Sequence, residues 1–358
     1  MRQHGRRFLN PINLFILALS VYLAACGQEH PGSTIDPVTS DYGSAIQSLY
    51  LTVFWWSVLI LIVVWGVLAY ILIRFRERPG GPEPKKTRGH LGLEIGWTVG
   101  AAIIVILITI PTIRTVFRTQ AEAGADAIVV EVIGHQWWWE FRYPAENVVT
   151  ANELHIPVGR SVDLRMWSAD VIHSFWVPRL GGKRDLNPLV REPEGGPPKV
   201  NRLKFTVDEA GIYSGQCAEF CGSAHALMGL QVIAEPQANF EEWVLRMKGP
   251  AAPDSGTLAE LGRELFMQST CVACHAIEGT SARGTLGPNL TRFGARTGIG
   301  AGLLENRPEN LAAWISNPAR FKPGVKMPGV AEPGGGSPPS GLSEEQVEAV
   351  AAYLSNLK

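Results

Sequence analysis

The chain has 358 residues, a formal net charge of −1 and no long block of like charge. This balance excludes the basic electrostatic footprint that nucleic-acid binding needs, so we expect no nucleic-acid partner. The length is enough for roughly two or three modest domains together with membrane segments.

The N-terminus has the order of a secretory signal. Arginines at positions 2, 6 and 7 precede an apolar run over 12–23, and small residues follow just before Cys26. This segment resembles a bacterial lipobox, so we predict a lipoprotein-type signal peptide over 1–25 and lipidation of Cys26. The alternative is a first membrane span with an ordinary buried cysteine, although the run is short for a span. Either interpretation exports residues 26–48.

Two apolar stretches, 49–73 and 91–113, are each long enough to cross a bilayer core, which needs about 20 helical residues. The loop between them, 74–90, is rich in arginine and lysine, and the positive-inside rule assigns it to the cytoplasm. We therefore expect a multi-pass protein of the bacterial plasma membrane. Everything after residue 113 then lies on the outer, periplasmic side, where sulfur can be oxidised or bound to metal.

Beyond the membrane segments the pattern changes twice. Short alternating and β-branched runs over 126–236 predict an all-β sandwich, residues 240–247 a short helix and 249–256 a linker. Residues 257–358 predict a small all-α domain, with helices over 258–268, from near Glu309, and over 344–357 after a cap at Ser343. The fold class is thus multidomain: a transmembrane helix hairpin, then an all-β domain, then an all-α domain.

The most specific run in the chain lies near the end of the β region. Cys217 and Cys221 are followed by His225 and Met228, and a further imidazole is available at His173 in a predicted strand-end segment. Thiolate, imidazole and a weak thioether together favour copper. The alternative is a Cys217–Cys221 disulfide in a structural turn. A copper-delivery chaperone can also show two such cysteines with a distant histidine, but it does not need the downstream histidine and methionine.

This pattern of Cys, three residues, Cys, three residues, His, two residues, Met resembles subunit II of cytochrome c oxidase with its copper A centre. The resemblance implies a cupredoxin-like sandwich in which the cysteines bridge a dinuclear copper site. It also implies the remaining ligands, which are His173, His225, Met228 and the backbone carbonyl of Glu219.

Three further roles are carried over by the same resemblance. Trp137, the first tryptophan of the run Gly134–Trp139, matches the residue that receives the incoming electron, although such runs are often core or interface. Glu94 matches a glutamate near the mouth of a proton pathway in the catalytic subunit, and its alternative is a solvated anchor. The Glu219 side chain matches one that reaches magnesium at the subunit interface, and its alternative is a surface carboxylate.

The second cysteine pair belongs to a haem c attachment motif. Cys271 and Cys274 would form thioethers to haem, and His275 would ligate the iron. Met327 lies downstream in a setting typical of class I cytochromes c, as the second axial ligand or as an unligated core methionine, and 287–290 resembles the loop that packs on haem. The alternative for the cysteine pair is a disulfide or zinc knuckle.

Together these motifs resemble a caa-type oxidase subunit II with a fused cytochrome c. The resemblance implies that electrons pass from haem c to copper A and on to a separate subunit I, where oxygen is reduced to water with proton pumping. The implied partners are subunit I, other oxidase subunits and a donor, either a cytochrome c or an upstream quinol–cytochrome c reductase. The rivals are a copper A-type nitric oxide reductase subunit and, from another class, a membrane-tethered copper-binding or chaperone module. A quinol oxidase subunit is disfavoured by the complete ligand set.

Overall fold

A computed structural model describes Ser20 and residues 37–77, 79–81, 83, 88–189, 200–249, 256–330 and 340–358. The expected signal peptide, apart from Ser20, and the expected lipidation at Cys26 lie outside the described residues. So do 250–255, the greater part of the expected linker.

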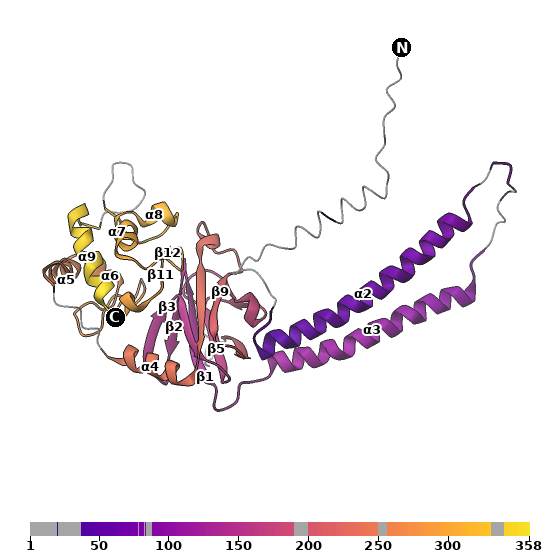
Figure 1. Ribbon diagram of the computed structural model, residues 1–358, viewed down its shortest axis with the longest axis horizontal. Helices are drawn as coiled ribbons and strands as arrows, with labels where there is room; N and C mark the ends of the chain where they lie inside the picture. Colours follow the sequence, from indigo (N-terminus) through magenta and orange to yellow (C-terminus); the bar gives the residue numbers. More distant parts are fainter. Residues whose placement is uncertain are drawn as a thin grey trace, which may run out of the picture.

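Two long antiparallel helices, α2 (Asp41–Arg74) and α3 (Leu91–Gln120), project from one side of the molecule (Figure 1). Both are long and apolar enough to cross a membrane, and most of their side chains are exposed in the isolated chain. Helix α2 begins eight residues before the apolar stretch, because the Ser40 side chain accepts a hydrogen bond from the Gly43 amide and caps it. The Asp41 carboxylate also accepts from the Thr206 amide at 2.7 Å, which fixes the start of the hairpin to the β region.

The middle of the chain is a sandwich of two five-stranded sheets, in the orders β3-β2-β1-β5-β8 and β4-β10-β9-β6-β7. Alternate side chains of strands such as β10 point inward, and Trp139, Phe141 and Phe175 are among the fully buried core residues. The strands are β1 (Ile128–His135), β2 (Trp138–Tyr143), β3 (Val148–Ala151), β4 (Glu153–Pro157), β5 (Ser161–Ser168), β6 (His173–Trp176), β7 (Arg184–Leu186), β8 (Asn201–Thr206), β9 (Gly211–Cys217) and β10 (Gly229–Glu235).

The C-terminal region is mostly helical and has a core of its own. Its elements are α5 (Thr257–Gln268), α6 (Cys271–Cys274), β11 (Gly298–Ile299), β12 (Leu304–Glu305), α7 (Pro308–Ser316), α8 (Pro318–Phe321) and α9 (Glu344–Asn356), and α4 (Gln237–Lys248) joins it to the sandwich. Ser343 caps α9 through a capping box with Gln346, as its position predicts. Helices α5 and α9 touch at Gly262, where an added Cβ would lie 1.9 Å from the Ala349 carbonyl oxygen. The predicted sequence of membrane hairpin, β-sandwich and helical domain is therefore confirmed. After the motifs predicted in them, the sandwich (126–236) is named the copper domain and 257–358 the cytochrome domain.

Candidate metal and haem sites

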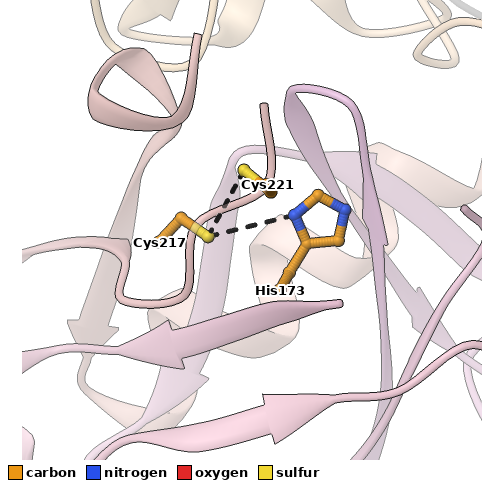
Figure 2. A group of neighbouring side chains, drawn as sticks. All are labelled: His173, Cys217 and Cys221. Atoms are coloured by element: carbon orange, nitrogen blue, oxygen red, sulfur yellow. Dashed lines mark hydrogen bonds between the residues drawn. The ribbon is translucent and has the colours of Figure 1, made fainter. Parts of the chain in front are cut away.

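The two cysteines of the copper motif lie side by side and next to the His173 ring (Figure 2). The Sγ atoms of Cys217 and Cys221 are 3.8 Å apart and both are free thiols. His173 Nδ1 lies 3.9 Å from the Cys217 sulfur, and His225 Nδ1 lies 3.6 Å from the Cys221 sulfur. Met228 Sδ lies 3.9 Å from the Cys221 sulfur. All five predicted side-chain ligands therefore converge on one small volume.

Strand pairing explains this convergence. His173 starts β6 and Cys217 ends β9, and these antiparallel strands pair at Phe175 and Cys217. The loop after β9 returns to β10 and is closed by a hydrogen bond from the Cys217 amide to the Met228 carbonyl at 2.9 Å. The Glu219 carbonyl oxygen points back to the Cys217 sulfur at 3.2 Å, while the Glu219 side chain is exposed.

A carboxylate that the sequence analysis did not single out orients His173. Asp170 Oδ1 lies 2.8 Å from His173 Nε2, so a proton held on Nε2 leaves the Nδ1 lone pair facing the sulfurs. Burial opposes protonation of His173, but the hydrogen bond to Asp170 raises its pKa overall. Gly134 makes room for the ring, because an added Cβ there would lie 2.7 Å from His173 Cδ2.

The thiols behave as one coupled pair. The hydrogen bond from Cys221 lowers the pKa of Cys217, and the same bond together with burial raises the pKa of Cys221. The pair therefore loses one proton easily but keeps the second, because two thiolates this close together in a buried site repel each other. A bound cation would offset the repulsion between two thiolates, so the donor set fits a thiolate-binding metal better than a pair of free thiols.

Trp137 connects this cluster to the C-terminal half of the chain. Its side chain is 6% exposed, and its indole Nε1 donates to the Cys221 carbonyl at 3.0 Å. Gln136 Nε2 donates to the same carbonyl at 2.9 Å. The two tryptophans that follow it in the run lie elsewhere: Trp138 stacks on His135, and Trp139 is fully buried in the core.

The second site is a cavity of about 650 Å³ that the cytochrome domain shares with the copper domain. Cys271, Cys274, His275 and Met327 all line it, as their predicted roles require, and so do Trp137 and Trp138 from the sandwich. Most of its exposed lining is apolar.

Local contacts prepare His275 as a ligand. Its Nδ1 donates to the Pro288 carbonyl oxygen at 2.7 Å. With the proton on Nδ1, the lone pair of Nε2 is the one available to a metal. Burial lowers the pKa of His275, so the imidazole stays neutral and able to bind a metal. Gly287 lets the loop approach the ring, since a Cβ there would lie 2.6 Å from His275 Cε1.

Two cationic side chains also line the cavity, the partly buried Arg296 and the buried Lys322, and sequence spacing indicated neither of them. Burial lowers the pKa of Arg296 to about 10 and that of Lys322 to about 7. Arg296 Nη2 donates to the Asn289 carbonyl, whereas among the described atoms Arg296 Nε has no hydrogen-bond partner. Charges away from water are normally paired, and an anionic group in this cavity would pair the Arg296 guanidinium.

Glu94, by contrast, lies far from both sites in sequence and structure. It is an exposed side chain in the first turn of α3, near the end of the hairpin that is distant from the sandwich (Figure 1). The structure therefore brings together the copper and haem candidates but adds nothing to the interpretation of Glu94.

Comparison with known proteins assigns three regions of the chain to families. Family models for the cytochrome c oxidase subunit II transmembrane domain, its periplasmic domain and cytochrome c match residues 31–115, 145–235 and 259–358. Cytochrome c oxidase subunit 2 of Alkalihalophilus pseudofirmus is 36% identical over 95% of this chain and 95% of that protein. The chain therefore belongs to the cytochrome c oxidase subunit II family. Membership makes it a component of a haem–copper oxidase that associates with subunit I, and the matched domains imply copper A and haem c.

Two other relatives are similar to this family member. Cytochrome c oxidase subunit 2 of Bacillus subtilis is 34% identical over 96% of this chain and 97% of that protein. The solved periplasmic domain of the oxidase subunit II of Bradyrhizobium japonicum is 26% identical over 36% of this chain and 97% of that domain, with a TM-score of 0.32. The apolar hairpin fits a membrane-anchored subunit with a C-terminal periplasmic part.

Proposed function

We propose that this chain is the electron-entry subunit of a proton-translocating cytochrome c oxidase. Electrons enter at a covalent haem c, pass to a dinuclear copper A centre and leave to subunit I, where oxygen is reduced to water. The observation that carries the proposal is the position of Trp137, which lines the haem cavity and donates a hydrogen bond to the Cys221 carbonyl. One side chain thus touches both candidate redox sites.

The donor set at the copper site supports a dinuclear centre. Cys217 and Cys221 would bridge the ions, and His173, His225, Met228 and the Glu219 carbonyl would complete their shells. A disulfide needs sulfurs about 2.05 Å apart, so the 3.8 Å separation favours metal ligation over the turn disulfide. When bound, copper supplies one-electron redox chemistry. Asp170 and the closed loop hold the ligands in one geometry, which keeps reorganisation small.

The cavity supports haem c in the same way. Cys271 and Cys274 would form the thioethers, and His275 and Met327 would supply the axial ligands. Haem also carries two carboxylates, and one of these would pair with the Arg296 guanidinium that lines the cavity.

Further assignments are part of the proposal: the oxidase family implies those of the hairpin, Glu219, Glu94 and the donor, and the lipobox-like N-terminus implies that of Cys26. The hairpin spans the plasma membrane with the copper domain (126–236) and cytochrome domain (257–358) on the periplasmic side. The Glu219 side chain reaches magnesium at the interface with subunit I, and Glu94 lies at a proton-pathway mouth. Cys26 carries lipid after removal of 1–25, and the donor is a separate cytochrome c or an upstream quinol–cytochrome c reductase.

The test is metal and haem analysis with electron paramagnetic resonance on the full chain, supplied with copper and matured for haem c. We expect a mixed-valence copper pair and one covalent haem. Cys217→Ser should abolish the copper signal and keep the haem, whereas a mononuclear copper signal or none in the wild-type chain would refute the relay and favour a tethered cytochrome or copper carrier. Met327→Ala should lower the haem potential, while Met267→Ala, a methionine of the same core, should not.

A further inference from the structure

The cytochrome domain does not only lie near the copper domain; it covers the surface over Trp137. Lys322, which follows α8, is 2% exposed, and its ammonium donates to the Trp137 carbonyl at 2.9 Å. The next residues lie on the same surface, since Ser223 Oγ donates to the Pro323 carbonyl at 3.2 Å. Gly324 has a φ of +82°, and a Cβ there would lie 3.2 Å from the Trp137 ring.

A second contact lies at another point of the interface. Glu153, at the start of β4, is 5% exposed although it is a carboxylate. Its Oε1 accepts from the Thr297 amide and hydroxyl, both at 2.7 Å, and from the Gly298 amide at 3.1 Å. Every one of these donors belongs to the cytochrome domain.

Both contacts have the character of specific docking. A buried charge costs free energy unless it is hydrogen-bonded, and here each charged group finds its acceptor or donors in the other domain. Separation of the domains would break charge-assisted hydrogen bonds at both points, so the interface selects one relative position. An adventitious contact between mobile domains would instead pair exposed, long side chains.

We propose that Lys322 and Glu153 latch the cytochrome domain over Trp137 and thereby reserve this face of the copper domain for the haem of the same chain. The proposal rests on the proposed function, since it presumes that Trp137 is the entry point. It adds that a separate cytochrome c cannot reach Trp137 directly and must deliver its electron to the fused haem. Lys322 and Glu153 are positioning residues and carry no electron themselves.

Hydrogen exchange in the copper- and haem-loaded full chain tests the latch without reference to activity. The Thr297 and Gly298 amides belong to the Glu153 contact, so Lys322→Met should speed their exchange by roughly ten- to a hundred-fold, the loss expected for one charge-assisted hydrogen bond. Exchange within α5 and α9 should stay unchanged. Arg320→Met is the matched control, because Arg320 is exposed and lies over the Phe321 ring of its own domain.

The reciprocal variant keeps the test decisive if Lys322→Met loses its fold. Glu153→Ala should speed exchange over 322–325, a segment on the other contact. Unchanged exchange at the remote contact in a folded variant, or an equal change in Arg320→Met, would overturn the latch. A loaded chain that fails this test refutes only the latch, whereas a chain that binds no copper pair or haem refutes the proposed function.

Electron delivery tests the second half of the proposal. With reduced soluble cytochrome c as donor, copper in the wild-type chain should be reduced only after the fused haem, in a step whose rate does not depend on donor concentration. Lys322→Met should add a phase of copper reduction proportional to donor concentration, and Arg320→Met should not. Parallel, donor-dependent reduction of copper in the wild-type chain would overturn the claim that the face is reserved.

Discussion

Asp170→Asn should weaken copper binding while leaving every proposed ligand in place. The carboxylate contacts His173 Nε2 at 2.8 Å and accepts from the Gln136 and Val171 amides, each at 2.7 Å. An asparagine of the same shape has one acceptor oxygen, so it cannot serve both sides, and it carries no charge. Hydrogen bonds to a charged group contribute about 1.5–3 kcal/mol each, and loss of a partner behind a ligating histidine typically costs roughly 10- to 100-fold in metal affinity.

The assay is competition for copper against a chelator of known affinity, on the full chain with haem attached. Asp185→Asn is the control, because Asp185 is an exposed carboxylate on the neighbouring strand β7. Thermal unfolding without copper separates a ligand effect from a loss of fold. Copper affinity within about twofold of wild type, or an equal loss in the Asp185 variant, would refute the view that Asp170 fixes the His173 ring.

Three further changes test packing and charge. Gly222→Ala should lower the free energy of unfolding by about 1–3 kcal/mol and disturb the loop between Cys217 and Met228. The reason is that φ at Gly222 is +118° and the new Cβ would lie 2.9 Å from Trp137 Cζ2. Unfolding with and without copper measures both effects. Gly262→Ala should lower the free energy of unfolding by at least about 1–3 kcal/mol, because its Cβ would meet the Ala349 carbonyl. Unchanged unfolding of the cytochrome domain would contradict this. Burial favours the neutral form of Glu140, but hydrogen bonds from His135 and Arg142 lower the pKa of this carboxyl below 4.5 overall. The contribution of the carboxylate to the free energy of unfolding is therefore present above pH 4.5 and lost as the pH falls through the lowered pKa. Glu140→Gln should thus destabilise the chain at pH 7 and much less in acid. A difference in urea unfolding that does not change with pH would contradict this direction.

The candidate sites could be predicted from the sequence largely because their ligands are local. Four of the copper side chains lie between positions 217 and 228, and the haem cysteines and histidine lie between positions 271 and 275. Such spacing is fixed by chain geometry, whatever the rest of the fold does. His173 needed the family resemblance, because only strand pairing brings it to Cys217.

What spacing could not predict are the long-range contacts. Lys322 and Trp137 are 185 residues apart, and Glu153 and Thr297 are 144 apart, so no local pattern joins them. Helix α2 also begins before the predicted membrane span, for a related reason. Hydropathy detects the apolar stretch, but Ser40 and its neighbour extend the helix through a cap and a contact to β8.

The central claim is that haem c and copper A exchange electrons within one chain. Photoreduction of the haem in the loaded chain, followed by absorption of the copper centre, tests it most directly. We expect haem reoxidation and copper reduction to share one first-order rate that does not change with protein concentration. A rate that rises with protein concentration, or a haem that stays reduced beside oxidised copper, would contradict the account.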